Sequence, residues 1–151
     1  MRKVKILAIA PYNTLADSIK LAANKREDID LTVHVGDLTT GKNIAMNLAH
    51  NNYDVIVSRG GTAELIRSSV ETPLVEINIS VYDILRSIKM AESFSGKFLI
   101  AGFSGITDIA NILCDLLQYD INIITFKNKQ NAYTCLKSAV CKRYSLIISD
   151  N

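Results

Sequence analysis

Proline and glycine, which are abundant in disordered and low-complexity proteins, are scarce in this chain. Its 151 residues include 2 prolines and 7 glycines, while 48% are hydrophobic and 21% are charged. Disordered and low-complexity chains are rich in proline, glycine or charge, so this composition excludes them. It predicts a globular protein with enough apolar material for a core, of a length that suits one domain or two small lobes.

A strong charge of either sign is also missing. The formal net charge is +2, and the basic residues are spread along the chain rather than gathered in the stripe that phosphate-backbone binding needs. We therefore expect no direct contact with nucleic acid. Apolar runs stay well short of the roughly 18 residues that span a membrane, and the first one ends at Pro11 without a cleavage pattern. We expect no membrane contact and a cytoplasmic location.

Patterns for metal binding and nucleophilic catalysis are absent as well. The three cysteines, Cys114, Cys135 and Cys141, show neither CxxC spacing nor a paired histidine. His34 and His50 have no neighbouring set of carboxylates or cysteines. The sequence therefore predicts no metal, no cofactor and no catalytic residue.

What the chain does contain is a regular alternation of apolar runs with segments of helical period. Several runs are continuous Val, Ile and Leu, which is typical of parallel strands covered on both faces. The predicted strands are 4–10, 31–35, 54–58, 74–77, 98–103, 121–125 and 146–149. The predicted helices are 14–25, 42–51, 62–69, 82–92, 107–117 and 129–140. This order predicts an α/β fold with doubly wound parallel sheets.

The alternation occurs twice. Segments 5–10, 30–33 and 53–58 are echoed by 97–102, 120–123 and 144–149 at an offset of about 90 residues. A constant offset predicts a tandem pseudo-repeat, with a first lobe at 1–80, a connecting helix at 81–96 and a second lobe at 97–151. The chain stops where the next βα unit of the second lobe would begin, so we expect that lobe to be truncated and the natural protein to be longer.

Ligands of open parallel sheets bind beyond the carboxyl ends of the strands, where helix N-termini converge. If the two lobes face each other, the loops at those ends border one cleft. The candidate ligand-binding residues selected by this rule are Pro11, Tyr12, Asn13, Ser58, Arg59, Gly60, Gly61, Thr62, Ser104, Gly105, Ser149 and Asn151.

The block Ser58-Arg59-Gly60-Gly61-Thr62 is the sharpest of these candidates. Its two glycines allow a tight turn with backbone N–H groups near a ligand, and its arginine presents a planar fork suited to carboxylate or phosphate. The spacing fits neither a Walker loop nor GxGxxG, so nucleotide binding is not predicted. A simple glycine turn with a solvent-facing arginine fits the block equally well, and the residues alone leave both interpretations open.

The stretch 54–67, which contains this block, is followed by Pro73-Leu74-Val75-Glu76-Ile77 and by Val81-Tyr82-Asp83-Ile84-Leu85-Arg86. In this order the chain resembles, over nearly its whole length, the N-terminal sensory domain of the propionate catabolism activators. The resemblance implies two flavodoxin-like lobes of three layers (α/β/α) around a cleft for small carboxylates such as 2-methylcitrate. The family commonly has Ser-Gly before Tyr-Asp, whereas this chain has Ser80-Val81.

The same resemblance implies partners. In that family the sensory domain is fused to an AAA+ ATPase domain, which engages sigma-54 RNA polymerase, and to a helix-turn-helix domain, which contacts DNA. Neither attached domain lies in these residues. A small organic anion effector would bind one state of the sensor more tightly than the other and shift the sensor toward that state. This shift would relieve repression of the ATPase. The sequence leaves open whether the chain forms a homodimer.

The alternative class is a racemase-like or lyase-like enzyme acting on a small carboxylate. Such two-lobed enzymes place a cysteine at the strand ends of each lobe to move protons. Here those positions hold Ser58, Ser104 and Ser149, and the candidate residues include no His or Lys that could serve as a base. The sequence therefore favours a sensor over an enzyme.

Overall fold

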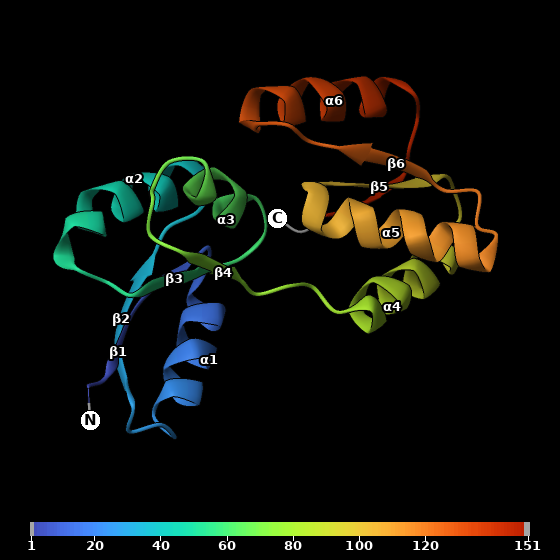
Figure 1. The fold of residues 1–151 in the computed structure, drawn as a ribbon. Coiled ribbons are helices and arrows are strands. Elements are labelled where there is room, and N and C mark those ends of the chain that lie inside the picture. The colour runs from blue at the N-terminus through green and yellow to red at the C-terminus, as the bar shows by residue number, and fades with distance from the viewer. Residues whose placement is uncertain (1, 150–151) are drawn as a thin grey trace. The chain divides into compact units, whose positions relative to one another are not determined.

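A computed structural model of the chain describes residues 2–149 (Figure 1). The chain divides into two compact units, Met1–Ile77 and Asn78–Asn151, and each contains a parallel sheet with helices on both faces. The predicted α/β class with two similar, three-layered lobes is confirmed. Within the described residues, no helix is both long enough and apolar enough to cross a membrane.

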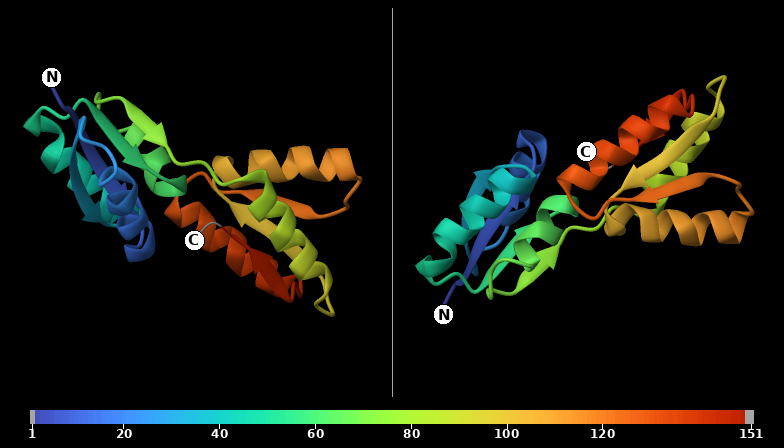
Figure 2. Two further views of the ribbon diagram at one scale, coloured as in Figure 1. Left: turned by 90° about the horizontal axis from the view of Figure 1, so that it is seen from below. Right: turned by 90° about the horizontal axis from the view of Figure 1, so that it is seen from above.

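Unit 1 alternates strands with α-helices, with one 3-10 turn between α2 and β3. Its sheet has the parallel order β2-β1-β3-β4, and α1 covers one face while α2 and α3 cover the other (Figures 1 and 2). The elements are β1 (Val4–Ala10), α1 (Asn13–Ala23), β2 (Ile29–Val35), α2 (Leu38–Leu48), a 3-10 turn (Ala49–Asn51), β3 (Val55–Ser58), α3 (Gly60–Arg67) and β4 (Leu74–Glu76).

Unit 2 repeats the plan with three strands in the parallel order β6-β5-β7. Helices α4 and α5 pack together on one face, and α6 lies on the other (Figure 1). Helix α4, expected from the sequence as a connector, packs against α5 and β7. The elements are α4 (Val81–Glu92), β5 (Phe98–Gly102), α5 (Ser104–Leu117), β6 (Asn122–Thr125), α6 (Lys129–Cys141) and β7 (Leu146–Ile148).

Each unit has its own apolar core, which explains why it is compact. In unit 1, Leu7 and Ile9 of β1 are fully buried against Ile56, Ala45 and Ile66. The central strand must be apolar on both faces because helices cover both, and Ala8 and Ala10 on its other face are fully buried too.

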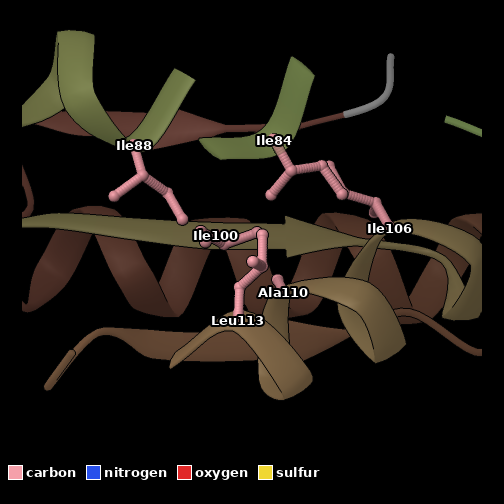
Figure 3. Packing of buried hydrophobic residues seen from close by; sticks show 6 residues of the cluster. All are labelled: Ile84, Ile88, Ile100, Ile106, Ala110 and Leu113. Carbon is pink, nitrogen blue, oxygen red and sulfur yellow. The ribbon is translucent and has the colours of Figure 1, made fainter. Parts of the chain in front are cut away.

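The core of unit 2 lies between β5 and the helix pair α4 and α5. Ile84 and Ile88 project from α4 toward Ile100 of the central strand (Figure 3). Ile106, Ala110 and Leu113, from three successive turns of α5, complete the cluster. Helix α4 is therefore held by side-chain packing within its own unit.

Several predicted boundaries are wrong, including the start of α5, which was expected at 107 and lies at Ser104, and the start of α2. Helix α2 begins at Leu38, whereas the sequence predicted a start at 42, after a turn at Gly41. Gly41 lies inside the helix, where it is needed for space rather than for a turn. A Cβ atom at Gly41 would lie 2.5 Å from Cγ2 of Thr62 and 2.6 Å from the carbonyl oxygen of Gly36. The missing side chain lets α2 approach α3 and the β2–α2 turn closely.

We predict that Gly41→Ala destabilises the protein, although the same change in an ordinary helix interior stabilises it by about 1 kcal/mol. The added methyl group would overpack a site bounded by backbone, which costs about 1–3 kcal/mol. Urea denaturation measures the change in the free energy of unfolding. Thr40→Ala, at the exposed neighbouring position of α2, serves as the control; a Gly41→Ala protein as stable as this control would contradict the packing argument.

Candidate functional site

The candidate residues of unit 1 lie at the topological switch point of its sheet. From β1 the chain moves outward to β2 and then returns to β3 on the other side of β1, so the order reverses between β1 and β3. In flavodoxin-like sheets this reversal opens a crevice at the carboxyl ends of the two strands. The segments there are 11–13, which lead from β1 into α1, and 58–62, which run from the last residue of β3 into the first turn of α3. The structure thus brings these two sequence-predicted segments to one edge.

Two helices begin at this edge. Helix α1 begins after Tyr12 and α3 after Arg59, and both residues have extended backbone conformations. In the described part of the chain, neither the Tyr12 nor the Arg59 side chain makes a capping hydrogen bond to its helix. The first-turn N–H groups of a helix lack intrahelical acceptors, and the helix dipole adds positive charge there. Gly60 has φ +56°, a left-handed conformation that favours glycine at the start of α3.

Arg59 and Tyr12 contact each other across the switch point. The Nη1 group of Arg59 donates a hydrogen bond of 2.9 Å to the hydroxyl oxygen of Tyr12. Arg59 is half-buried, and Tyr12 is 41% exposed. Because a phenol is neutral, this contact orients the guanidinium without cancelling its charge. A guanidinium has five N–H donors in a fixed fork, so donors remain for an anion.

Ser58 and Thr62 flank this arginine but are buried, with 0% and 1% exposure. The Ser58 hydroxyl donates to the carbonyl of Ile9 at 2.7 Å, which ties β3 to β1. The Thr62 hydroxyl oxygen accepts from the N–H of Leu38 at 2.8 Å, which ties α3 to the β2–α2 turn. These two hydroxyls hold the loops, while Arg59 and Gly60 are the part-exposed residues between them. A ligand contact by any of the four stays a prediction.

Sequence reasoning missed the turn after β2. Residues 36–38 reach the same edge, and the N–H of Leu38 binds the hydroxyl of Thr62 in the first turn of α3. Leu38 has φ +37°, an unusual value for a residue with a side chain. The strand-end rule that selected the turns after β1 and β3 also applies to Gly36-Asp37 after β2 and would have found it.

Unit 2 has an equivalent edge of its own. Its switch point lies between β5 and β7, and Ser104 and Gly105 begin α5 directly after β5. Ser149 is exposed after β7, so the structure brings these three candidates to neighbouring strand ends. Behind them Thr107 is fully buried and accepts a hydrogen bond of 2.8 Å from the Thr125 hydroxyl. The remaining candidate, Asn151, lies outside the described residues.

Cysteine and metal chemistry find little support at these edges. Among residues 2–149, no group of three or more His, Cys, Asp or Glu side chains could hold a metal ion. Cys114 is buried in α5, and this burial, together with the charge of Asp115, raises the pKa of its thiol. A raised pKa disfavours the reactive thiolate. Cys135 lies in α6, away from the strand ends.

The chain is similar to a family model and to a solved structure, which are described as an activator and a transcriptional regulator. A family model described as propionate catabolism activator matches residues 25–151, which include the Arg59 block, strands β2 to β4 of unit 1 and the sheet of unit 2. Curated proteins give no match. Among solved structures, the chain is similar to the crystal structure of an NtrC family transcriptional regulator from Clostridium acetobutylicum, with a TM-score of 0.78 and 21% identity over 96% of this chain and 76% of that chain. At this identity the likeness shows the fold.

We predict that Thr62→Val destabilises unit 1. Valine keeps the shape of threonine but removes the acceptor for the Leu38 N–H, and an unsatisfied part-buried group costs about 1–3 kcal/mol. Urea denaturation of the variant measures this cost, with Thr14→Val in the exposed first turn of α1 as the control. Unfolding midpoints that agree between Thr62→Val and wild type would show that the bond does not hold the turn.

Proposed function

Because the chain belongs to the propionate catabolism activator family, we propose that it is the effector-sensing domain of a sigma-54-dependent transcriptional activator of the NtrC type. In this proposal the domain works in the bacterial cytoplasm and is not an enzyme. The observation that carries it is Arg59, held by Tyr12 at the β1/β3 switch point between the N-termini of α1 and α3.

This arrangement suits a small organic anion with a carboxylate group. The planar guanidinium binds the two oxygens of a carboxylate side by side, and a point charge such as lysine would not orient them. The first-turn N–H groups of two helices add neutral donors and partial positive charge at the same edge. Ser58 and Thr62 fix the backbone on both sides of Arg59, so little conformational freedom remains to be lost on binding.

Regulation follows from binding rather than from chemistry. An effector shifts the sensor toward the conformation that it binds better, by no more than the difference in its affinity for the two conformations. In the proposed full-length regulator, that shift relieves repression of a downstream AAA+ ATPase domain, and the attached domains contact DNA and sigma-54 polymerase. The sequence-based expectation that both lobes share the effector stays a prediction.

A racemase or lyase is the weaker candidate. Proton transfer in such enzymes needs a thiol or another acid–base group at the strand ends. Ser58 occupies that place in unit 1, and its hydroxyl is buried and donates to a backbone carbonyl. The thiol of Cys114 is buried within α5. These placements favour binding over catalysis.

We predict that Arg59→Ala weakens effector binding without unfolding the protein. Thermal-shift titration of wild type with a panel of small di- and tricarboxylates identifies the effector, which stabilises the protein by about 2.7 kcal/mol at 100 times its dissociation constant. Loss of a charge-assisted hydrogen bond costs about 1.5–3 kcal/mol, so the dissociation constant should rise by about 10-fold to 100-fold.

Arg26→Ala is the matched control. Arg26 is an exposed arginine of the same unit that precedes β2, at the opposite end of the sheet, and it pairs with Asp28. Both variants lose the same charge, but only Arg59→Ala should lose the effector response. An equal response from Arg59→Ala and Arg26→Ala would reject the arginine site, and the absence of any response in wild type would reject a carboxylate effector.

A further inference from the structure

The outer strand β2 of unit 1 is unusually open for an edge strand. It pairs with β1 along all seven residues, from Val4 opposite Ile29 to Ala10 opposite Val35, in one unbroken register. Other outer strands of the described sheets are shorter, with three or four residues. Edge strands usually avoid further pairing through lysine, proline, bulges or short length. The sequence of β2, IDLTVHV, has no lysine or proline, and its register shows no bulge.

The sequence of β2 is also complementary to itself when reversed. In an antiparallel pair of two copies centred on Thr32, Ile29 lies opposite Val35 and Leu31 lies opposite Val33. The acidic Asp30 then lies opposite His34, and Thr32 lies opposite its own counterpart. Thr–Thr pairs are among the cross-strand contacts that stabilise antiparallel sheets, and an imidazole N–H can donate a hydrogen bond to a carboxylate opposite it.

Other registers lose this complementarity. Centring the pair on Asp30 places two carboxylates opposite each other, and centring it on His34 places two imidazoles together. Only the register centred on Thr32 uses the whole strand and pairs the acid with the imidazole on both sides of the axis.

Side-chain direction is consistent with such pairing. Asp30, Thr32 and His34 align with Lys5, Leu7 and Ile9 of β1, so they lie on the sheet face that α2 and α3 cover. Asp30 is exposed and His34 is half-buried. A two-fold axis perpendicular to the sheet keeps each face on its own side, so Asp30 of one copy and His34 of the other meet on the same face.

The opposite face offers space for the second copy. Leu31 and Val33 line an open groove of about 500 Å³ between the edge strand and α1, and its lining also includes the charged residues Lys20 and Arg26. Helix α1 packs on both β1 and β2, so the α1 helices of two paired copies would lie about two strand spacings apart. That separation is about 10 Å, the ordinary distance between packed helices.

From these observations we infer that β2 is a homodimer interface: two copies of this chain pair antiparallel through β2 about an axis at Thr32 and join their four-stranded sheets into one continuous sheet. The occupant of this edge is thus a second copy of the chain. This inference does not depend on the proposed effector site.

Sedimentation velocity of the 151-residue chain, from low micromolar to near-millimolar concentration, tests the inference. Wild type should dimerise. His34→Asp places carboxylates opposite each other twice in each dimer, so the dimer dissociation constant should rise about tenfold or more. The double variant Asp30→His/His34→Asp restores complementary pairs in reversed order and should return to within about threefold of wild type.

The chain offers a matched control in His50→Asp, the same change at an exposed histidine of the same unit outside β2. This control should dimerise like wild type, and circular dichroism should show that all variants are folded. A wild-type protein that stays monomeric at every concentration overturns the inference. A dimer that is equally stable in His34→Asp overturns it too, because the interface then lies elsewhere.

Cross-linking gives an independent test of the axis. Thr32→Cys places a thiol opposite its own counterpart, so mild oxidation should yield a disulfide-linked dimer. Wild type, which carries Cys114, Cys135 and Cys141, sets the background. Cross-linking no greater than this background, in a protein that dimerises, would exclude an axis at Thr32.

Discussion

Two buried hydroxyl groups hold the switch-point edge of unit 1 together. Ser58 ties the end of β3 to the Ile9 carbonyl of β1, and Thr62 ties the first turn of α3 to the Leu38 N–H after β2. Three successive strand ends are therefore bound to one short segment. Arg59 lies inside that segment, so the position of its backbone is set by the sheet and not by a ligand. Everything proposed for the effector site depends on this fixed backbone.

Much of the fold follows from the sequence because parallel sheets covered on both faces leave a strong signal. Strand β1 was predicted at 4–10 and lies at Val4–Ala10, since its continuous apolar run is what two helical layers require. The start of α2 could not be predicted in the same way. Glycine usually marks a turn, and only the contacts of Gly41 with Thr62 and the Gly36 carbonyl show that it serves close packing inside a helix.

The sequence predicted where the candidate site lies in the fold, but not which of its polar groups are exposed. The strand-end rule depends only on chain order and correctly brought Tyr12 and Arg59 to one edge. Whether a hydroxyl faces solvent depends on residues far away in the chain: Ser58 bonds to a residue 49 positions away, and Thr62 to one 24 positions away. Local sequence contains no trace of such partners. The strand-end rule also predicts the place of the β2–α2 turn at 36–38, but the sequence does not predict its bond to Thr62.

Strand β2 connects the two proposals physically. Its edge carries the inferred homodimer interface, and its carboxyl end leads directly into the turn whose Leu38 N–H binds Thr62, three residues after Arg59. A change in the conformation of this turn therefore affects both the segment that contains Arg59 and the carboxyl end of β2. If effector binding changes the free energy of dimerisation through this turn, dimerisation changes the free energy of effector binding by the same amount, since coupling between two binding equilibria is reciprocal. A strand shared by an effector site and a two-fold axis is thus a direct route by which a small anion could alter the association of two regulator subunits.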